Sequence, residues 1–579
     1  MPYSSRIGKA NLPSLIVVTG LFCWGVTQTG PVMIGGHFNL LPTALAVMGS
    51  IAGLRLAMEL LMRAARIVDW ASSYKTTGKG GTAKWASRKQ IHKELNKKKE
   101  GHFWGLMTGR RSLALFADFV SNAMSVAPAG SGKGIYTVIP ALLSIRHSKV
   151  VSDFKGELVC IVLKALQAQG QVNRILNPGS LWQELIGITD SYNPLDIIVD
   201  DLRRPGGLRD VPDDLRELSA QLYPEPAETQ GDNTYWREGS RRAIADAILL
   251  ETMVEQYDAT LSSVALLIED RDAFERNLRW MVGVDLEGDP LPEGPMPIEQ
   301  TEWASLHDPE DLAEFVKLVR SRARNLLALM TGVDSRTFDS FISGSQQALA
   351  PFAFGRLAPA MRRSTFSMSD LKEGDKPTNL FIVADASRME GYKAYIGLIQ
   401  WCAMTAIKRH PDKARPVYFI MDEATNYKIH ALESLLTWGR SNGLRLHLIF
   451  QDLSAFVRVY GKQVLETLLS ETEIKQFLPG QRSPKTLELI EKLLGEQSVM
   501  AASLSSKSEG MSEQTSESGR ALMTADEIRR SPYGLLLVRR QPPIKIEPIS
   551  YAEVEPWRKQ ADINPFHGKP FLKKVRLKL

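Results

Sequence analysis

The feature that most limits how this chain can fold is a stretch of 45 residues, from Ala10 to Leu54, that contains no Asp, Glu, Lys or Arg. A helix needs about 20 apolar residues to cross the hydrocarbon core of a membrane, so the stretch is too long for one crossing and fits two joined by a turn. We place the two spans at about Pro13 to Ile34 and Leu40 to Met62, with the turn near GGHFN, residues 35 to 39.

Basic residues flank both predicted spans, whereas the turn between them carries no Lys or Arg. Arg6 and Lys9 precede the first span, and Arg63 and Arg66 follow the second. By the positive-inside rule, both flanks face the cytoplasm. A cleaved signal peptide and a buried helical hairpin remain as alternatives, although neither explains a second apolar stretch bounded by arginines. Two transmembrane helices with the bulk of the chain in the cytoplasm are the expected arrangement.

Charge is concentrated just after the second span. Between Lys75 and Arg111 there are 11 Lys or Arg and two acidic residues. Such a run contacts anionic lipid, stays solvated, or contacts a nucleic acid directly. The net charge of +6 over 579 residues does not by itself indicate a nucleic-acid partner. The three cysteines are far apart and form no C-x-x-C pair, so we expect neither a disulfide framework nor a structural zinc site.

The rest of the chain alternates apolar strand patterns with helical patterns, which predicts an α/β fold with a parallel sheet. The predicted strands are Asn122 to Val126, Lys149 to Asp153, Asn379 to Ala384, Val417 to Met421 and Arg445 to Phe450. Between the second and third strands, helical periodicity marks Arg237 to Gln256 and Glu310 to Met330. Ser498 to Ser518 has eight serines and few apolar residues, which predicts a mobile loop.

The stretch SVAPAGSGKGIYTVIP, residues 125 to 140, almost matches the phosphate-binding loop G-x-x-x-x-G-K-S/T. It offers a strand, a glycine turn, a lysine and a following helix, which together cradle phosphate. Ala127 replaces the first glycine, a small change at a position that only bounds the loop. Gly134 replaces the hydroxyl residue that normally binds magnesium, and Thr137 lies almost a turn too far along to substitute for it. Alone, the motif is also compatible with a chance glycine turn.

A second motif favours a nucleotide site. PVYFIMDEATN, residues 416 to 426, is an apolar strand that runs into Asp422 and Glu423, as in a Walker B element. There the aspartate holds magnesium and the glutamate polarises the attacking water. Two such motifs on one chain predict that the following residues bind the nucleotide: Ala127, Pro128, Ala129, Gly130, Ser131, Gly132, Lys133 and Gly134.

Several further motifs accompany these two along most of the chain. They include GTAKWAS at 81 to 87, SDFKGE at 152 to 157, YNPLD at 192 to 196, TYWREGSRRA at 234 to 243, and LLTWGRSNGLRLHLIFQDLSAF from residue 435. In this order they resemble the type IV secretion coupling proteins of the TraG/VirD family, the inner-membrane ATPases of conjugation and effector export. In this group a glycine commonly follows the loop lysine, so the resemblance implies that Gly134 is a subfamily trait.

The resemblance implies a RecA-like P-loop NTPase domain with an inserted all-α domain, assembled as a homo-hexamer in the bacterial inner membrane. It implies ATP and Mg²⁺ as cofactors. The implied partners are a relaxase-bound DNA single strand, effector proteins, or both, together with inner-membrane components of the secretion channel. The expected domains are a membrane anchor at 1–70, a nucleotide-binding domain at 71–253 and 349–560, the all-α insert at 254–348 and a basic tail at 561–579.

The resemblance also implies roles for single residues. Lys133 binds phosphates, Asp422 coordinates magnesium and Glu423 activates water. Gln451 senses the terminal phosphate, with strand capping as the alternative, and Arg440 is an arginine finger for the neighbouring subunit, with a plain surface arginine as the alternative. Asp153 and Lys155 match the family pattern D-x-K-G-E, without an assigned role.

Two rival functions remain open. One is an FtsK-like DNA translocase, which would be expected to carry a C-terminal DNA-reading module. The other is a receptor of the secretion channel that binds substrate without hydrolysing ATP.

Overall fold

The computed structural model describes residues 33–34, 37–38, 78–95, 101–109, 112–227, 233–284, 298, 301–332, 335–507, 510–568 and 575–579. The chain divides into two compact units. The smaller contains Met1–Thr82 and Glu496–Arg520, and the larger contains Ala83–Gly495 and Ala521–Leu579.

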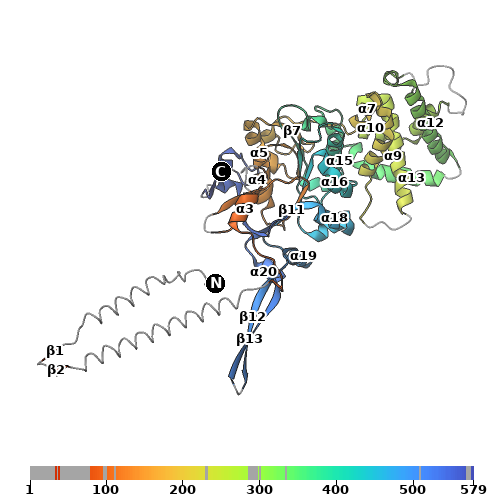
Figure 1. Cartoon of the computed structure of the whole chain (residues 1–579). Coiled ribbons are helices and arrows are strands. Elements are labelled where there is room, and N and C mark those ends of the chain that lie inside the picture. Colours follow the sequence, from red (N-terminus) through yellow and green to blue (C-terminus); the bar gives the residue numbers. More distant parts are fainter. Residues whose placement is uncertain are drawn as a thin grey trace. The chain divides into compact units, whose positions relative to one another are not determined.

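The larger unit has an α/β fold around one mixed sheet of 11 strands (Figure 1). Seven strands run parallel to one another, in the order β11 (Thr472–Phe477), β5 (Asn122–Val126), β10 (Leu444–Phe450), β9 (Val417–Met421), β6 (Ser148–Asp153), β8 (Thr378–Val383) and β7 (Val172–Leu176). An antiparallel extension follows beyond β11, with β14 (Gly534–Val538), β15 (Ile544–Glu547), β3 (Phe103–Met107) and β4 (Leu113–Phe116). The sheet is therefore larger than predicted and is not purely parallel.

The five predicted strands are confirmed, and each agrees with the structure to within one residue at either end. Four of them, β5, β6, β8 and β9, are buried along their whole length. Such continuous burial is typical of a parallel sheet, because both of its faces are covered. The strands of the antiparallel extension are short, and in β15 buried and partly buried residues alternate.

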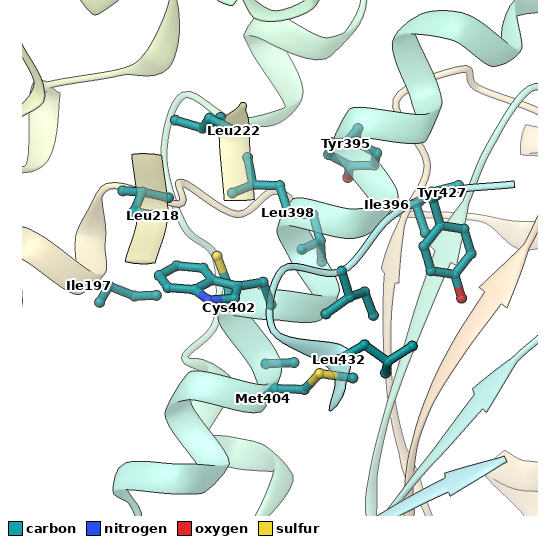
Figure 2. Close-up of a cluster of buried hydrophobic side chains, with 14 of the residues drawn as sticks. Ile197, Leu218, Leu222, Tyr395, Ile396, Leu398, Cys402, Met404, Tyr427 and Leu432 are labelled. Carbon is teal, nitrogen blue, oxygen red and sulfur yellow. The ribbon is translucent and has the colours of Figure 1, made fainter. Parts of the chain in front are cut away.

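Successive residues of the central strands point into two separate cores. Leu448 and Phe419 belong to one core, whereas Ile449 and Ile420 belong to the other, as the two-residue period of a strand requires. On one face lie α4 (Ile139–Ser144) and α5 (Glu157–Ala168), and on the other lies α15 (Met389–Arg409). Figure 2 shows side chains of α15 packed with Leu218 and Leu222.

The described residues between β7 and β8 form helices and turns. The main helices are α7 (Asp196–Arg203), α8 (Val211–Leu222), α9 (Asn233–Glu255), α10 (Leu261–Glu269), α11 (Arg271–Val282), α12 (Pro309–Thr331) and α13 (Ser335–Ala353). The periodicity predicted α9 and α12. The latter begins where Asp308 accepts a hydrogen bond from the Glu310 N–H and Pro309 opens the first turn. The predicted end of the all-α insert, residue 348, lies inside α13 and not between two helices. The insert at 254–348 therefore stays a proposal about domain organisation.

The two predicted membrane spans lie outside the described residues, apart from Met33 and Ile34 at the end of the first. There Met33–Ile34 (β1) pairs antiparallel with His37–Phe38 (β2), which reverses the chain at the predicted turn. Among the described residues, no helix combines the length and the apolar composition of a membrane crossing.

The prediction of a mobile loop at Ser498 to Ser518 is wrong. The segment forms a two-stranded sheet of β12 (Glu496–Lys507) and β13 (Gly510–Ala521). Only two residues join the strands, so they are antiparallel. Backbone hydrogen bonds of a hairpin do not need apolar side chains, which explains why a serine-rich composition misled the prediction. The family motif at residue 81 contributes to this unit, since the Ser498 N–H donates to the Gly81 carbonyl at 3.0 Å and Thr82 bridges to Gln497.

The last residues of the chain pack onto the larger unit. The Asp562 N–H donates to the carbonyl of Ile161 in α5 at 2.9 Å. Farther on, β17 (Leu577–Lys578) pairs in parallel with β16 (Val554–Glu555). The described parts of the predicted tail at 561–579 are thus held by the fold.

Candidate functional site

Three chain segments that bear predicted site residues meet at the carboxyl edge of the parallel strands. The loop 127–134 follows β5, Asp422 follows β9, and Gln451 follows β10. Because β10 lies between β5 and β9 with all three parallel, the ends of these strands emerge side by side. Ligands of open α/β sheets bind at this edge.

The loop after β5 has the backbone of a phosphate cradle. The Ala127 N–H donates to the Phe450 carbonyl at 2.9 Å, and the Ser131 N–H donates to the Pro128 carbonyl at 3.0 Å. Gly130 and Gly132 have φ values of +78° and +77°, which favour glycine. A Cβ added to Gly130 or Gly134 would meet no atom within 4 Å, so the loop opens onto free space.

The helix that follows the loop begins with a π-helical turn, Gly134–Val138, before α4. The first N–H groups of a helix have no acceptor within the helix, and its dipole favours an anion at this end. A π-turn inside a helix frequently marks a functional site. The open loop and this helix end together fit the terminal phosphates of a nucleotide.

Lys133 lies between the two acidic residues of the second motif. Its Nζ is 3.0 Å from Asp422 Oδ1 and also forms an ion pair with Glu423 Oε1. Burial lowers the pKa of Lys133, but the negative charges of Asp422 and Glu423 outweigh it and leave the pKa above its ordinary value. Burial raises the pKa of Asp422, against the opposing effect of Lys133. The predicted phosphate and magnesium ligands therefore occupy one site.

Glu423 adopts an unusual backbone conformation, with φ of +50°. This left-handed region is rare for a residue with a side chain and recurs at functional sites. Gln451 Nε2 lies 3.3 Å from Glu423 Oε2, so the predicted sensor contacts the predicted water-activating residue directly. The structure thus brings Gln451, Glu423 and Lys133 together.

Thr137 is not available as a substitute for the missing hydroxyl at position 134. It is fully buried and donates its hydroxyl to Gln476 Oε1 at 3.1 Å. Ser125 donates to the same oxygen at 2.7 Å. No sequence motif marks Gln476, because the contact joins strands that are about 350 residues apart. In contrast, the buried Ser131 Oγ has no hydrogen-bond partner among the described residues, which leaves a hydroxyl free within the loop.

The loop residues fit a nucleotide, whereas the side chains at the site supply only part of a magnesium-binding site. Asp422 supplies a carboxylate, the ligand type that magnesium prefers. A loop without a hydroxyl at position 134 leaves a larger share of the magnesium shell to water and phosphate, as this ion commonly accepts.

Arg440 does not join the site within one chain. It is exposed and lies in the short helix Gly439–Asn442 that precedes β10, whereas Gln451 follows β10. A seven-residue strand spans about 20 Å. Arg440 is therefore at the amino edge of the sheet, opposite the phosphate loop.

Asp153 ends β6 and has a structural role that the sequence did not reveal. Its Oδ2 accepts a hydrogen bond from the Val159 N–H at 2.9 Å, in the first turn of α5. The residue before α5, Gly156, has φ of +68° and provides no capping side chain, so Asp153 caps the helix in its place. Lys155 is exposed, and its carbonyl accepts from Trp182 Nε1 at 2.8 Å.

The larger unit resembles known structures in its fold. The bacterial conjugative coupling protein TrwB superposes with a TM-score of 0.54 at 16% identity, over 82% of this chain and 95% of that chain. TrwB has been solved with the non-hydrolysable ATP analogue ADPNP and with ADP and Mg²⁺.

Sequence relatives are found among proteins of conjugative transfer. The protein VirD4 of Rhizobium radiobacter is 24% identical over 487 residues, which are 81% of this chain and 64% of the relative. The conjugal transfer protein TraG of Escherichia coli is 26% identical over 438 residues, 71% of this chain and 62% of the relative. This chain thus spans less than two thirds of the length of either relative. The family model described as type IV secretory system conjugative DNA transfer matches residues 74–565, and the chain therefore belongs to that family.

Proposed function

We propose that this protein is an ATPase of a type IV secretion system that couples nucleotide hydrolysis to the transfer of DNA, effector proteins or both. The observation that supports this best is the meeting of Lys133, Asp422, Glu423 and Gln451 at one edge of the sheet. These are the four groups that phosphoryl transfer to water requires: a phosphate-binding cation, a metal ligand, a base and a sensor.

Each residue has a distinct role in the proposed reaction. The loop 127–134 binds the nucleotide phosphates through backbone N–H groups and Lys133. Asp422 helps to hold Mg²⁺, which neutralises charge on the phosphates when it is bound. Glu423 orients and polarises the attacking water, and Gln451 reports the state of the terminal phosphate to Glu423 through their direct contact at 3.3 Å.

Nucleotide binding would rearrange the ion pairs that Lys133 forms with Asp422 and Glu423. Lys133 is engaged by both carboxylates. Phosphate would compete with both carboxylates for Lys133, and Asp422, released from Lys133, would be free to hold magnesium. Binding of the nucleotide together with its metal therefore keeps the site neutralised, whereas a nucleotide without metal leaves two uncompensated carboxylates.

The proposal also covers the membrane anchor, the oligomeric state, the cargo and the docking partners of the protein. The uncharged run at 10–54 supports a two-span anchor in the bacterial inner membrane. The exposed Arg440, on the opposite edge from the loop of its own chain, suits a homo-hexameric ring in which it reaches the neighbouring site. Relaxase-bound single-stranded DNA and effector proteins are the proposed cargo. The helices within 254–348 are the proposed contact for the protein cargo, and inner-membrane channel components are the proposed docking partners.

The decisive experiment is to measure magnesium-dependent ATP hydrolysis by the purified assembly. Lys133→Ala should abolish turnover, and Glu423→Gln should bind ATP without hydrolysing it. Lys393→Ala is the matched control, because Lys393 is a partly exposed lysine paired with Glu390 on α15. Activity no greater than that of Lys133→Ala would contradict the proposal.

A second candidate function is a receptor that binds ATP but does not hydrolyse it. The observations that favour it are Gly134 and the engagement of Thr137 by Gln476, since both remove a side-chain ligand for magnesium. Tight ATP binding without turnover by the wild-type assembly, together with intact cargo binding, would establish the receptor instead.

A further inference from the structure

Helix α17 (Leu453–Tyr460) lies between two contacts to the turn that follows β9. Gln451, two residues before the helix, contacts the carboxylate of Glu423. Tyr460, the last residue of the helix, places its hydroxyl 3.0 Å from the Tyr427 carbonyl and 3.3 Å from the Ala424 carbonyl. The helix therefore reaches the same turn from both of its ends.

The turn held in this way contains Glu423 in its left-handed conformation. The Asn426 N–H donates to the Glu423 carbonyl at 2.8 Å, and the Ala424 N–H donates to the Ile449 carbonyl at 2.9 Å. A left-handed residue with a side chain persists only where its surroundings hold it. The Tyr460 hydroxyl supplies part of that hold, because the two carbonyls that it reaches lie one and four residues after Glu423.

Tyr460 is itself fixed by packing. Its ring lies 4.9 Å from that of Phe456, which lies 5.2 Å from that of Phe450 at the end of β10. At the other end of the helix, Asp452 accepts a hydrogen bond from the Ala455 N–H at 2.9 Å and caps it. The hydroxyl is thus presented by a rigid element, as a residue that positions another must be.

The other side of the turn is also anchored. Tyr427, whose carbonyl receives the Tyr460 hydroxyl, turns its own side chain into the core beneath the sheet (Figure 2). There its hydroxyl accepts from Gln400 Nε2 at 2.9 Å and lies 3.1 Å from Ser152 Oγ. The turn is consequently braced by α15 and β6 on one side and by α17 on the other.

We propose that Tyr460 is a positioning residue for Glu423: its hydroxyl holds the turn that aims the water-activating carboxylate. The inference rests on the proposed ATPase function. It assigns to Tyr460 no contact with nucleotide or water. Loss of the hydroxyl should therefore lower the rate of the chemical step and leave nucleotide binding intact.

The test compares Tyr460→Phe with Tyr395→Phe in the full chain. Tyr395 is the matched control, because it is buried like Tyr460 and its hydroxyl has no hydrogen-bond partner among the described residues. For Tyr460→Phe we expect kcat for ATP to fall about tenfold, the scale of one hydrogen bond that acts in the transition state. The KM should stay within about twofold of the wild-type value, because ground-state binding is untouched. Tyr395→Phe should match the wild type in both.

A second readout does not depend on activity. Hydrogen exchange of the peptide covering residues 422–428 should be faster in Tyr460→Phe than in the wild type and in Tyr395→Phe, because the turn opens more often. Unchanged exchange, or a KM that rises with unchanged kcat, would overturn the inference, and so would faster exchange without loss of kcat. If the wild type hydrolyses no ATP, the proposed function fails, and the exchange measurement still decides whether Tyr460 orders the turn.

Discussion

The Nζ atom of Lys133 lies 3.0 Å from Oδ1 of Asp422, so the residue offered to phosphate is paired with the residue offered to magnesium. Glu423 shares the same ammonium group. The charge of Lys133 is therefore balanced by side chains of the site itself. A ligand must replace these interactions and not simply add to them, which makes the charge state of each partner a determinant of affinity.

The first prediction concerns binding without metal. Glu423→Gln removes one of the two negative charges that engage Lys133, so ADP without magnesium should bind more tightly to this variant than to the wild type. We expect a gain of a few fold, about 1 kcal/mol, the scale of a partly exposed ion pair. Titration calorimetry in the presence of a chelator measures it, with Glu390→Gln as the control on an exposed carboxylate. Weaker binding would contradict the competition between phosphate and carboxylates.

The second prediction restores the missing hydroxyl. A Cβ at Gly134 would meet no atom within 4 Å, so Gly134→Ser is sterically permitted. The new hydroxyl gives magnesium a ligand that the natural loop lacks, and the magnesium concentration for half-maximal hydrolysis should fall several fold, on the order of one metal–ligand contact. Gly134→Ala adds the same Cβ without the oxygen and is the control. If both variants lowered the magnesium requirement equally, the added Cβ would act through the helix and the new hydroxyl would not be a metal ligand.

The third prediction uses Asp153. Burial, with Glu157 and Asp422 nearby, raises the pKa of Asp153 to about 7, against hydrogen bonds from the Val159 and Lys155 N–H groups. An unfolded carboxyl has a pKa of about 3.9, so between these values the folded state holds a proton that the unfolded state has lost. Stability from this group is present at low pH and is lost as the pH rises through about 7.

The variant Asp153→Asn should remove this part of the pH dependence. Urea midpoints at pH 5 and pH 8 should differ less for the variant than for the wild type, with about 1.4 kcal/mol for each pKa unit. Asp270→Asn changes an exposed helix cap and serves as the control. The same pH dependence in Asp153→Asn and in the wild type would refute the assignment.

The fourth prediction concerns Arg440. Since it lies at the amino edge of the sheet, it can complete only the site of another subunit. Arg440→Ala should lower hydrolysis by about 10³- to 10⁵-fold in a uniform assembly, as other arginine fingers do. Mixed assemblies with Lys133→Ala subunits should regain activity, because an intact site then meets an intact finger. Arg388→Ala, at another exposed arginine, is the control. No recovery on mixing would argue against action between subunits.

The fifth prediction concerns cargo. DNA should bind with little sequence preference, and log affinity should fall against log salt by roughly 0.7 to 0.9 per phosphate contacted. Because the net charge is only +6, we expect binding to strengthen on assembly. Reversing the exposed charges of α12 with Lys317→Glu and Arg324→Glu should weaken capture of effector or relaxase more than DNA binding. Salt-insensitive binding, or equal losses of both, would contradict this division of roles.

The sequence predicted the parallel core well, because strands such as β8 and β9 are rich in apolar residues and motifs mark the carboxyl ends of β5 and β9. The structure brings the predicted residues Lys133, Asp422, Glu423 and Gln451 together at one edge, and their roles in catalysis stay predictions. The sequence could not predict the contact of Thr137 with Gln476, because a hydrogen bond between a helical turn and a strand 339 residues away leaves no local pattern. It also misjudged the serine-rich hairpin, whose order comes from backbone pairing and not from composition.

The hairpin β12–β13 leaves the larger unit at Gly495 and the chain returns at Ala521. At this junction the Leu522 N–H donates to the Gly495 carbonyl at 2.9 Å. The segment that leads into the hairpin and the segment that leads out of it are therefore in direct contact. An element whose ends already meet can be lengthened, exchanged or excised with little strain on its host. The length and sequence of this hairpin can therefore change without redesign of the 11-stranded sheet.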